Sequence, residues 1–418
     1  MEEKTEKFII AGIHTGIADK ISDTTDESVS ELEELIKTAG GETIGILIQN
    51  KNEIEPGTYL GTGKLEELKD AVSTLGADAV VFDNELSPIQ LKNITDFLGI
   101  KVLDRSMLIL DIFALRAKSG EGKLQVELAQ LKYTLPRLRG MGLQMSRTGG
   151  GIGTRGPGET RLETDRRHIN RRIHALEEEI KELEKHRDLI RARRKKDGVI
   201  TAALVGYTNA GKSTLLNCLT DAGVFAEDKL FATLDPTSRA ITLPDNRQIL
   251  LVDTVGFIRK LPHHLINSFK STLEEAAVAD ILLEVIDASD DLYTDKIKVT
   301  SSVLCDIGAG GKPIIGVYNK ADLCRDTVGF ADFDKSVLIS AKNKSGIDSL
   351  ISAIGEVAPG KKRECTLLIP YSDGSVLSAL HEKQKIIDED YTPDGVSVKA
   401  LLDREAEDRY GNYIIIGD

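Results

Sequence analysis

The chain of 418 residues is long enough for about three domains, and its hydrophobic content of 41% is that of globular material with an ample core. Its net charge of −13 excludes a protein that is basic all over, and no stretch approaches the ~18 apolar residues of a membrane span. The N-terminus lacks the apolar part of a signal peptide and the four cysteines are widely spaced, so we expect a reduced, cytoplasmic protein without a zinc site or a disulfide framework.

The N-terminal segment, residues 1–115, alternates strand-like and helix-like patterns, which predicts a small α/β domain with a mainly parallel sheet. Strand patterns occupy residues 8–12, 42–48, 79–82 and 101–103, and helix patterns occupy residues 28–39, 63–75 and 87–98. Residues 61–64 read Gly-Thr-Gly-Lys, which is half of a phosphate loop, but Leu65 follows where Ser or Thr is needed. We therefore favour a helix-initiating turn there over a second nucleotide site.

A helical period replaces this alternation in residues 116–197. Leucines recur there with 4-3-4-3 spacing at Leu124, Leu128, Leu131, Leu135 and Leu138. A second apolar series follows at Leu162, Ile169, Ile173, Leu176, Ile180, Leu183 and Ile190. Two heptad-like helices joined by a short connection predict an antiparallel helical hairpin with coiled-coil packing, its connection at residues 140–160.

The predicted hairpin is basic within an acidic chain, with 21 Lys and Arg against 12 Asp and Glu in residues 116–197. Such a balance indicates a face directed at a polyanion. The glycine-rich connection carries Arg147 and Arg155, with Arg161 just beyond, and we interpret these three as RNA contacts at the tip of a stiff stalk. A disordered linker and a solvated charged helix remain the alternatives.

The clearest chemical motif lies at residues 206–213, Gly-Tyr-Thr-Asn-Ala-Gly-Lys-Ser, directly after an apolar run at 200–205. This is a strand followed by a phosphate loop, whose glycines let backbone N–H groups point at phosphate oxygens. Lys212 is expected to reach the β and γ phosphates, and Ser213 to bind Mg²⁺. A helix over residues 214–220 would add its N-terminal dipole. The expected nucleotide contacts here are Gly206, Tyr207, Thr208, Asn209, Ala210, Gly211, Lys212, Ser213 and Thr214.

Three further segments follow in the order that a guanine-nucleotide domain requires, each at the end of a predicted strand. The first comprises Asp253, Thr254, Val255 and Gly256; its aspartate is expected to hold Mg²⁺ through water, and the Gly256 N–H group to contact the γ-phosphate. The second comprises Asn319, Lys320 and Asp322, and its carboxylate can accept hydrogen bonds from both N1–H and N2–H of guanine. The third comprises Ser340, Ala341 and Lys342, and it offers a backbone N–H group to guanine O6.

A first switch is expected at residues 231–237, where Phe231, Ala232 and Thr233 are candidate nucleotide contacts. A threonine there can bind Mg²⁺ and the γ-phosphate, but spacing does not separate Thr233 from Thr237. With Lys212 and Gly256, this threonine completes the predicted catalytic set.

Two further residues near the predicted site bear on its chemistry. Phe257 stands where many GTPases place a glutamine, so we expect slow intrinsic hydrolysis unless a partner completes the site. Asn209 would either hold a monovalent cation such as K⁺ or only shape the loop, and both interpretations remain open.

The remaining chain divides into a P-loop G domain with a doubly wound sheet, residues 198–358, and a small α+β domain, residues 359–418. In the latter we predict strands at 365–369, 396–402 and 413–416 and a helix at 375–385. No catalytic set of residues is visible there, and His381 is interpreted as a helix-surface residue.

These motifs together resemble the HflX-type GTPases, a ribosome-associated, translation-factor-related family. The resemblance covers nearly the whole chain and is most specific at residues 59–64, 82–90, 151–160, 231–236, 253–257 and 370–374. It selects Thr233 as the switch threonine and implies binding to the large ribosomal subunit in the GTP state. It also implies a hairpin tip near the peptidyl-transferase centre and a role in splitting stalled or idle ribosomes. Some members are thought to bind ATP through the N-terminal domain, which the incomplete motif at 61–64 leaves open.

From the sequence we therefore predict a monomeric GTPase that uses GTP and Mg²⁺ to control binding to ribosomal RNA. A GTPase acting in ribosome maturation or RNA modification is the second hypothesis, and it predicts binding to precursor particles or tRNA. The third is an RNA chaperone with a regulatory nucleotide latch, for which a Lys212→Ala variant would still remodel RNA.

Overall fold

The computed structural model of the protein describes residues 5–16, 24–145, 157–196, 198–220, 231, 237–260, 270–324, 327–359, 363–402 and 404–417. The chain forms two compact units. The first comprises Met1–Arg191, Ala226–Asp235 and Val255–Glu274, and the second comprises Ala192–Phe225, Pro236–Thr254 and Glu275–Asp418. The four domain boundaries expected from the sequence, 1–115, 116–197, 198–358 and 359–418, stay predictions.

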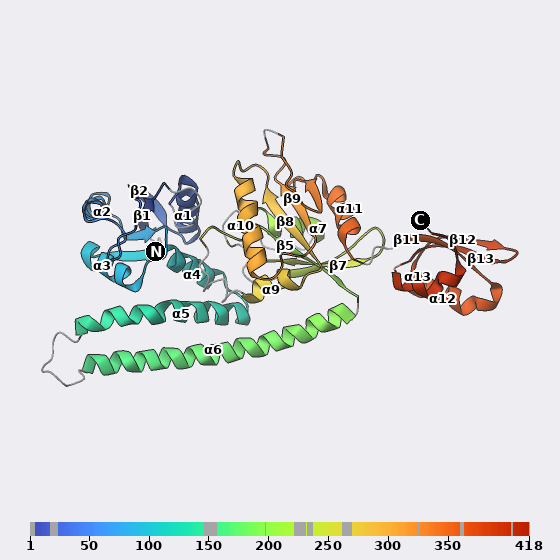
Figure 1. Ribbon diagram of the computed structural model, residues 1–418, viewed down its shortest axis with the longest axis horizontal. Coiled ribbons are helices and arrows are strands. Elements are labelled where there is room, and N and C mark those ends of the chain that lie inside the picture. Colours follow the sequence, from blue (N-terminus) through green and yellow to red (C-terminus); the bar gives the residue numbers. More distant parts are fainter. Residues whose placement is uncertain are drawn as a thin grey trace. The chain divides into compact units, whose positions relative to one another are not determined.

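The first unit contains a four-stranded parallel sheet of order β2-β1-β3-β4 (Figure 1). Its strands are β1 (Lys7–His14), β2 (Glu42–Asn50), β3 (Ala79–Phe82) and β4 (Lys101–Asp104), and its helices are α1 (Asp26–Thr38), α2 (Thr62–Leu75), α3 (Pro88–Leu98) and α4 (Arg105–Arg116). Every strand and helix expected in this region is present. Gly61 is the N-cap of α2 and Lys64 pairs with Glu67 at 2.9 Å, so residues 61–64 initiate a helix as favoured above.

The sheet is covered on both faces because successive strand side chains point in opposite directions. Ile9 and Val80 pack with α2 and α3 in one core, whereas Ile10 and Val81 pack with α1 and α4 in the other. Helix α4 was not expected from the sequence, because residue 105 follows β4 without a turn signal. Asp104, the last residue of β4, caps α4 by accepting a hydrogen bond from the Met107 N–H group at 2.9 Å.

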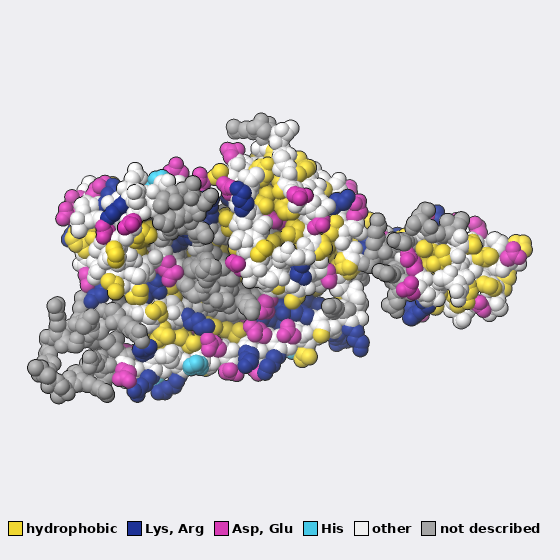
Figure 2. All heavy atoms as spheres, viewed as in Figure 1, with side chains coloured by type: hydrophobic (Ala, Val, Ile, Leu, Met, Phe, Trp, Pro, Cys, Tyr) yellow, Lys and Arg dark blue, Asp and Glu magenta, His cyan; other side chains and the backbone are white. Residues whose placement is uncertain are grey.

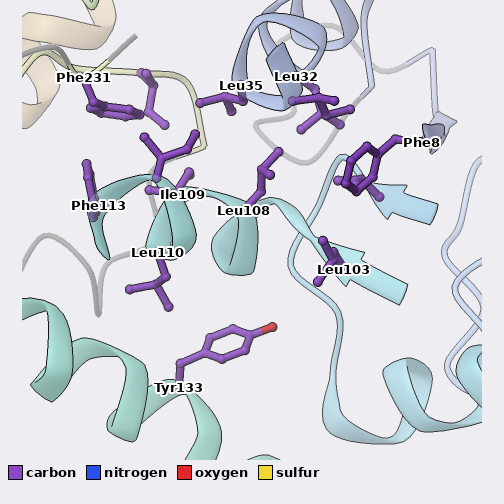
Figure 3. Packing of buried hydrophobic residues seen from close by; sticks show 14 of the residues in the cluster. Phe8, Leu32, Leu35, Leu103, Leu108, Ile109, Leu110, Phe113, Tyr133 and Phe231 are labelled. Atoms are coloured by element: carbon purple, nitrogen blue, oxygen red, sulfur yellow. The ribbon is translucent and has the colours of Figure 1, made fainter. Parts of the chain in front are cut away.

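The second of these cores also contains residues from distant parts of the chain. Phe231 packs edge-on against Phe113 of α4, with ring centroids 4.7 Å apart, and Figure 3 shows it beside Ile109 and Leu35. Val255 and Ile258 belong to the same cluster. The N-terminal sheet is therefore completed by residues that the sequence analysis placed around the nucleotide site.

The predicted hairpin is confirmed as two long helices, α5 (Gly120–Met145) and α6 (Pro157–Lys196). Their shared seam comprises Leu124, Leu128, Leu131, Leu135, Ile169, Ile173, Leu176 and Ile180. Both helices extend into the expected connection at 140–160, because the glycines at its ends are accommodated in helix. Ile190, expected in the seam, is instead 40% exposed.

Helix α5 is anchored to the N-terminal sheet by polar contacts as well as by the core. The Tyr133 hydroxyl donates to the buried Asp104 carboxylate at 2.6 Å, and Arg137 donates to the Leu86 carbonyl at 2.9 Å. Burial raises the pKa of Asp104, while the Tyr133 hydrogen bond acts in the opposite direction. Helix α5 is therefore attached to the N-terminal sheet midway along its length.

The second unit contains a six-stranded sheet of order β10-β9-β8-β5-β7-β6, parallel except for β6, which is antiparallel to β7. Its strands are β5 (Ile200–Val205), β6 (Thr237–Thr242), β7 (Gln248–Asp253), β8 (Ile281–Asp287), β9 (Ile314–Asn319) and β10 (Lys335–Leu338). Helices α7 (Lys212–Thr220) and α11 (Ile347–Val357) pack on one face and α10 (Tyr293–Asp306) on the other. Helix α9 (Lys270–Val278) runs from the first unit into the second. Helices on both faces confirm the doubly wound sheet.

The C-terminal region forms a separate antiparallel sheet of order β12-β13-β11-β14. Its elements are β11 (Arg363–Ile369), α12 (Gly374–Lys383), β12 (Lys385–Thr392), β13 (Gly395–Leu402), α13 (Arg404–Tyr410) and β14 (Ile414–Gly417). Strand β12 and helix α13 were not expected, and Lys385 begins a strand where the sequence predicted the end of a helix. An acidic edge strand shows little of the apolar alternation by which strands are recognised. His381 lies on α12 and pairs with Glu389 at 2.9 Å, which confirms it as a helix-surface residue.

The predicted α/β multidomain fold class is thus confirmed. Among the residues that the structure describes, none of the helices combines the length and the apolar character needed to cross a membrane.

A buried acid in the second unit yields a test of this fold. Glu284 on β8 is 1% exposed, and burial raises its pKa to about 8 against the opposing hydrogen bond of Thr300. Because the folded state favours the neutral form, the free energy of unfolding should fall as pH rises from about 4.5 to about 8. Glu284→Gln should remove this decline and stabilise the protein at pH 8 by about 2–4 kcal/mol, measured by denaturant titration across pH.

The matched control is Glu356→Gln on α11, whose exposed carboxylate pairs with Lys335. It should leave the pH dependence unchanged. Parallel pH profiles for the wild type and Glu284→Gln would contradict the raised pKa.

Candidate nucleotide-binding site

The phosphate loop connects β5 to α7, and its backbone requires glycine at two positions. Gly206 has a φ of +132°, and a Cβ atom there would lie 2.3 Å from the Val285 carbonyl oxygen. Gly211 has a φ of +95°, and a Cβ atom would lie 2.3 Å from Asn319 Nδ2. Any side chain would therefore displace β8 or the guanine motif. Asn209 also has a positive φ of +61°, which asparagine tolerates, so it at least shapes the loop.

Lys212 is held inside this loop. Its Nζ donates to the carbonyls of Gly206 at 3.0 Å and Tyr207 at 2.7 Å, and the residue is only 7% exposed. Burial lowers the pKa of Lys212 to about 8, although the nearby Asp253 carboxylate counteracts the shift. A phosphate beside it would favour the charged ammonium form again, which is the expected behaviour of a phosphate-binding lysine.

Two of the three expected magnesium ligands, Ser213 and Asp253, meet at the start of α7. The Ser213 hydroxyl donates to Asp253 Oδ2 at 2.8 Å, and Asp253 is 0% exposed. A hydroxyl and a carboxylate side by side are hard oxygen donors of the kind that Mg²⁺ prefers, so these residues fit the ion. Thr254 fixes the strand end by donating to the Leu204 carbonyl at 2.7 Å. The buried Thr208 hydroxyl has no hydrogen-bond partner within the described chain and is available to a phosphate oxygen.

The guanine motif is braced against the phosphate loop. Asn319 donates to the Ala210 carbonyl at 2.9 Å and accepts from the Ala341 N–H group at 2.9 Å. Asp322 accepts a hydrogen bond from the Ser340 hydroxyl, and this contact lowers the pKa of Asp322. The carboxylate is therefore held in its charged form, as the recognition of two guanine N–H groups requires.

One residue of this arrangement was not predicted from the sequence. Asp287, at the end of β8, forms an ion pair of 2.7 Å with Lys320 and so fixes the lysine of the guanine motif. A signal was present, because residues 281–286 are a buried apolar strand that ends in an aspartate, like the strand before Asp253. The glutamate within that run obscured it.

The structure brings most of the predicted contacts together in the second unit, namely Gly206, Tyr207, Thr208, Asn209, Ala210, Gly211, Lys212, Ser213, Thr214, Asp253, Thr254, Asn319, Lys320, Asp322, Ser340, Ala341 and Lys342. Val255 and Gly256 belong to the first unit, so their contact with nucleotide stays a prediction. The Phe231 ring is buried against Phe113 in the first unit, and its contact with nucleotide also stays a prediction. Thr237 is the first residue of β6, and it lies opposite Asp253 in the antiparallel register of β6 and β7.

Several predicted residues lie outside the described chain: Ala232, Thr233, Arg147 and Arg155. Arg161 lies on α6, but its side chain is not among those described. The choice between Thr233 and Thr237, and the three arginine contacts, therefore stay predictions.

Comparison with known proteins agrees with this geometry. Models of a GTP-binding GTPase N-terminal region, a GTP-binding GTPase middle region and a 50S ribosome-binding GTPase match residues 26–114, 116–194 and 201–320. GTPase HflX of Caldanaerobacter subterraneus subsp. tengcongensis is 55% identical over 390 residues, covering 93% of this chain and 91% of that protein. The chain belongs to the HflX family of GTPases. GTPase HflX of Escherichia coli (strain K12) is 43% identical over 374 residues, covering 88% of each chain.

The chain is also similar to a solved structure, that of a GTP-binding protein from the archaeon Sulfolobus solfataricus in complex with GDP. It is 26% identical, with a TM-score of 0.44, over 84% of this chain and 98% of that one. Membership of the HflX family makes the protein a GTPase that binds GTP and GDP, as the motifs predicted.

The Asp322 carboxylate yields a prediction about base specificity. Asp322→Asn should weaken GDP binding by about 2–3 kcal/mol, because the amide cannot accept from both guanine N–H groups. Xanthosine diphosphate should bind the variant better than GDP does, since xanthine has a carbonyl in place of the amino group. Calorimetric titration with both nucleotides measures the reversal.

Asp348→Asn, on the exposed first turn of α11, is the control and should bind GDP normally. An Asp322→Asn variant that still prefers GDP would show that the carboxylate does not read the base.

Proposed function

We propose that this GTPase binds the large ribosomal subunit in its GTP state and promotes splitting or rescue of stalled or idle ribosomes, with hydrolysis driving release. The observation that carries the proposal is a basic helical hairpin in the same compact unit as residues 255–260, which we expect to sense nucleotide. The match of residues 201–320 to a 50S ribosome-binding GTPase model supports the large subunit as partner. We expect the protein to act as a cytoplasmic monomer.

The hairpin has the reach and rigidity to enter an RNA cavity. Helix α6 has 40 residues, which corresponds to about 60 Å at the usual helical rise. Its apolar seam with α5 stiffens it, and the Tyr133 and Arg137 contacts fix α5 midway along its length. A stiff stalk positions its tip without a large loss of conformational entropy on binding.

The charge of the hairpin suits ribosomal RNA. Residues 137–172 contain nine arginines and only three acidic residues. Figure 2 shows basic side chains distributed along the outer edge of α6, with acidic ones between them. Two of the arginines are in exposed ion pairs, Arg167 with Glu163 and Arg172 with Glu127. Such surface pairs contribute little and can be exchanged for contacts to RNA phosphates.

The nucleotide site would supply the switch. Lys212 would neutralise charge on the β and γ phosphates, and Ser213 and Asp253 would hold Mg²⁺, which when bound neutralises further phosphate charge. The Gly256 N–H group and Thr233 are proposed to meet the γ-phosphate. Phe257 is buried and cannot orient water, so we propose that hydrolysis is slow until the ribosome completes the site.

Co-sedimentation with purified mature ribosomal subunits tests the proposal, comparing a non-hydrolysable GTP analogue with GDP. Binding to the large subunit should require the analogue. Replacing Arg147, Arg155 and Arg161 together by alanine should weaken binding at least about tenfold and reduce its salt dependence, because phosphate contacts release counterions.

The control variant replaces three exposed lysines in surface ion pairs outside the hairpin, Lys37, Lys298 and Lys335, and should bind normally. Absence of binding in both nucleotide states would contradict the proposal. Selective binding to precursor particles or tRNA would instead favour a role in ribosome maturation or RNA modification.

A further inference from the structure

The N-terminal sheet places a buried carboxylate where parallel sheets usually bind ligands. Strand β2 is added on one side of β1, and β3 and β4 are added on the other side, so the strand order reverses at β1. In such sheets, ligands tend to bind at the carboxyl ends of the strands where the order reverses. Asp83 directly follows β3 there and is 0% exposed. It accepts hydrogen bonds from the Ser28 hydroxyl at 2.6 Å and from Arg105 at 3.0 Å.

The occupant of this position is a side chain of the same protein. Lys260 donates to the Asp83 carboxylate and, at 2.8 Å, to the Asn84 side-chain oxygen. Its side chain is 11% exposed, so the pair is largely removed from water. The contact joins residues 177 positions apart in the sequence.

Charge balance shows why a cation is needed there. Arg105 pairs with both Asp83 and Glu31, whose side chains are 0% and 10% exposed. Lys260 supplies the second positive charge. Breaking a buried ion pair by removing one partner is costly because the other charge remains desolvated. The backbone is held too, because the Arg259 N–H group donates to Glu31 at 3.3 Å.

Lys260 lies four residues after Gly256, which places the two Cα atoms at most about 14 Å apart. Between them, Ile258 is buried in the core with α1 and α4. Lys260 itself has a φ of +54°, a left-handed conformation that a lysine keeps only when its surroundings hold it. The segment after Gly256 is therefore fixed at several points on the N-terminal sheet.

We propose that Lys260 and Asp83 form a clamp that pre-orders the segment around Gly256, so that the N-terminal domain sets the preference for GTP over GDP. With the segment already ordered, contact with the γ-phosphate costs less conformational entropy. GDP has no γ-phosphate and is insensitive to the clamp. Lys260 and Asp83 are positioning residues here, and the inference rests on the GTPase activity and the predicted Gly256 contact, independent of any ribosomal partner.

The test is calorimetric titration of the full-length protein with GDP and with β,γ-imido-GTP. Lys260→Met keeps the packing of the side chain and removes its charge. We expect its affinity for the imido analogue to fall about tenfold and its affinity for GDP to change less than twofold. Lys260→Arg should restore most of the difference, and Asp83→Asn should reproduce the loss.

Gln90→Met is the matched control, because it removes a hydrogen bond to the Glu55 carbonyl from the same unit, on helix α3, which packs in the core on the other face of the sheet. It should leave the ratio of the two affinities unchanged. Equal losses for both nucleotides in Lys260→Met, no loss, or tighter binding of the analogue would each overturn the clamp. None of these outcomes depends on whether the protein binds ribosomes.

Discussion

The constraint on which the structure depends is a shared hydrophobic core on one face of the N-terminal sheet. Helices α1 and α4 cover that face, and Phe231, Val255 and Ile258 pack into the same cluster. Phe231 is the first residue of the expected first switch, and the other two lie on either side of Gly256. Because a close-packed core resists gradual deformation, these segments cannot move without disturbing α4. The core that covers the N-terminal sheet therefore includes residues from the two segments expected to sense nucleotide.

The same core also receives the helical hairpin. Tyr133 of α5 is buried in it and donates to Asp104, the residue that caps α4. Helix α4 thus contacts both the hairpin and the residues beside Gly256. A conformational change in the residues beside Gly256 could therefore reach the hairpin through α4 alone. This arrangement gives the proposed link between GTP binding and RNA binding a physical basis.

The phosphate loop and the buried strands could be predicted from the sequence, because each depends on residues that are contiguous in the chain. A phosphate loop needs glycine at positions such as Gly206 and Gly211, and a strand buried on both faces has a recognisable apolar run. The burial of Phe231 and the pairing of Lys260 with Asp83 could not be predicted, because they join residues far apart in sequence. Helix α4 was not predicted because no turn signal separates it from β4. Strand β12 was not predicted because its acidic sequence lacks the apolar alternation of a strand. Asp287 was overlooked because Glu284 interrupts its strand.

Hydrogen exchange of backbone amides, compared between GDP and a non-hydrolysable GTP analogue, tests the shared core most directly. If nucleotide sensing and the N-terminal sheet are one cooperative structure, the analogue should slow exchange in α4 and in residues 255–260 together, relative to GDP. Identical exchange of α1 and α4 in the two states, with both nucleotides protecting the phosphate loop, would show that the N-terminal core does not respond to the γ-phosphate.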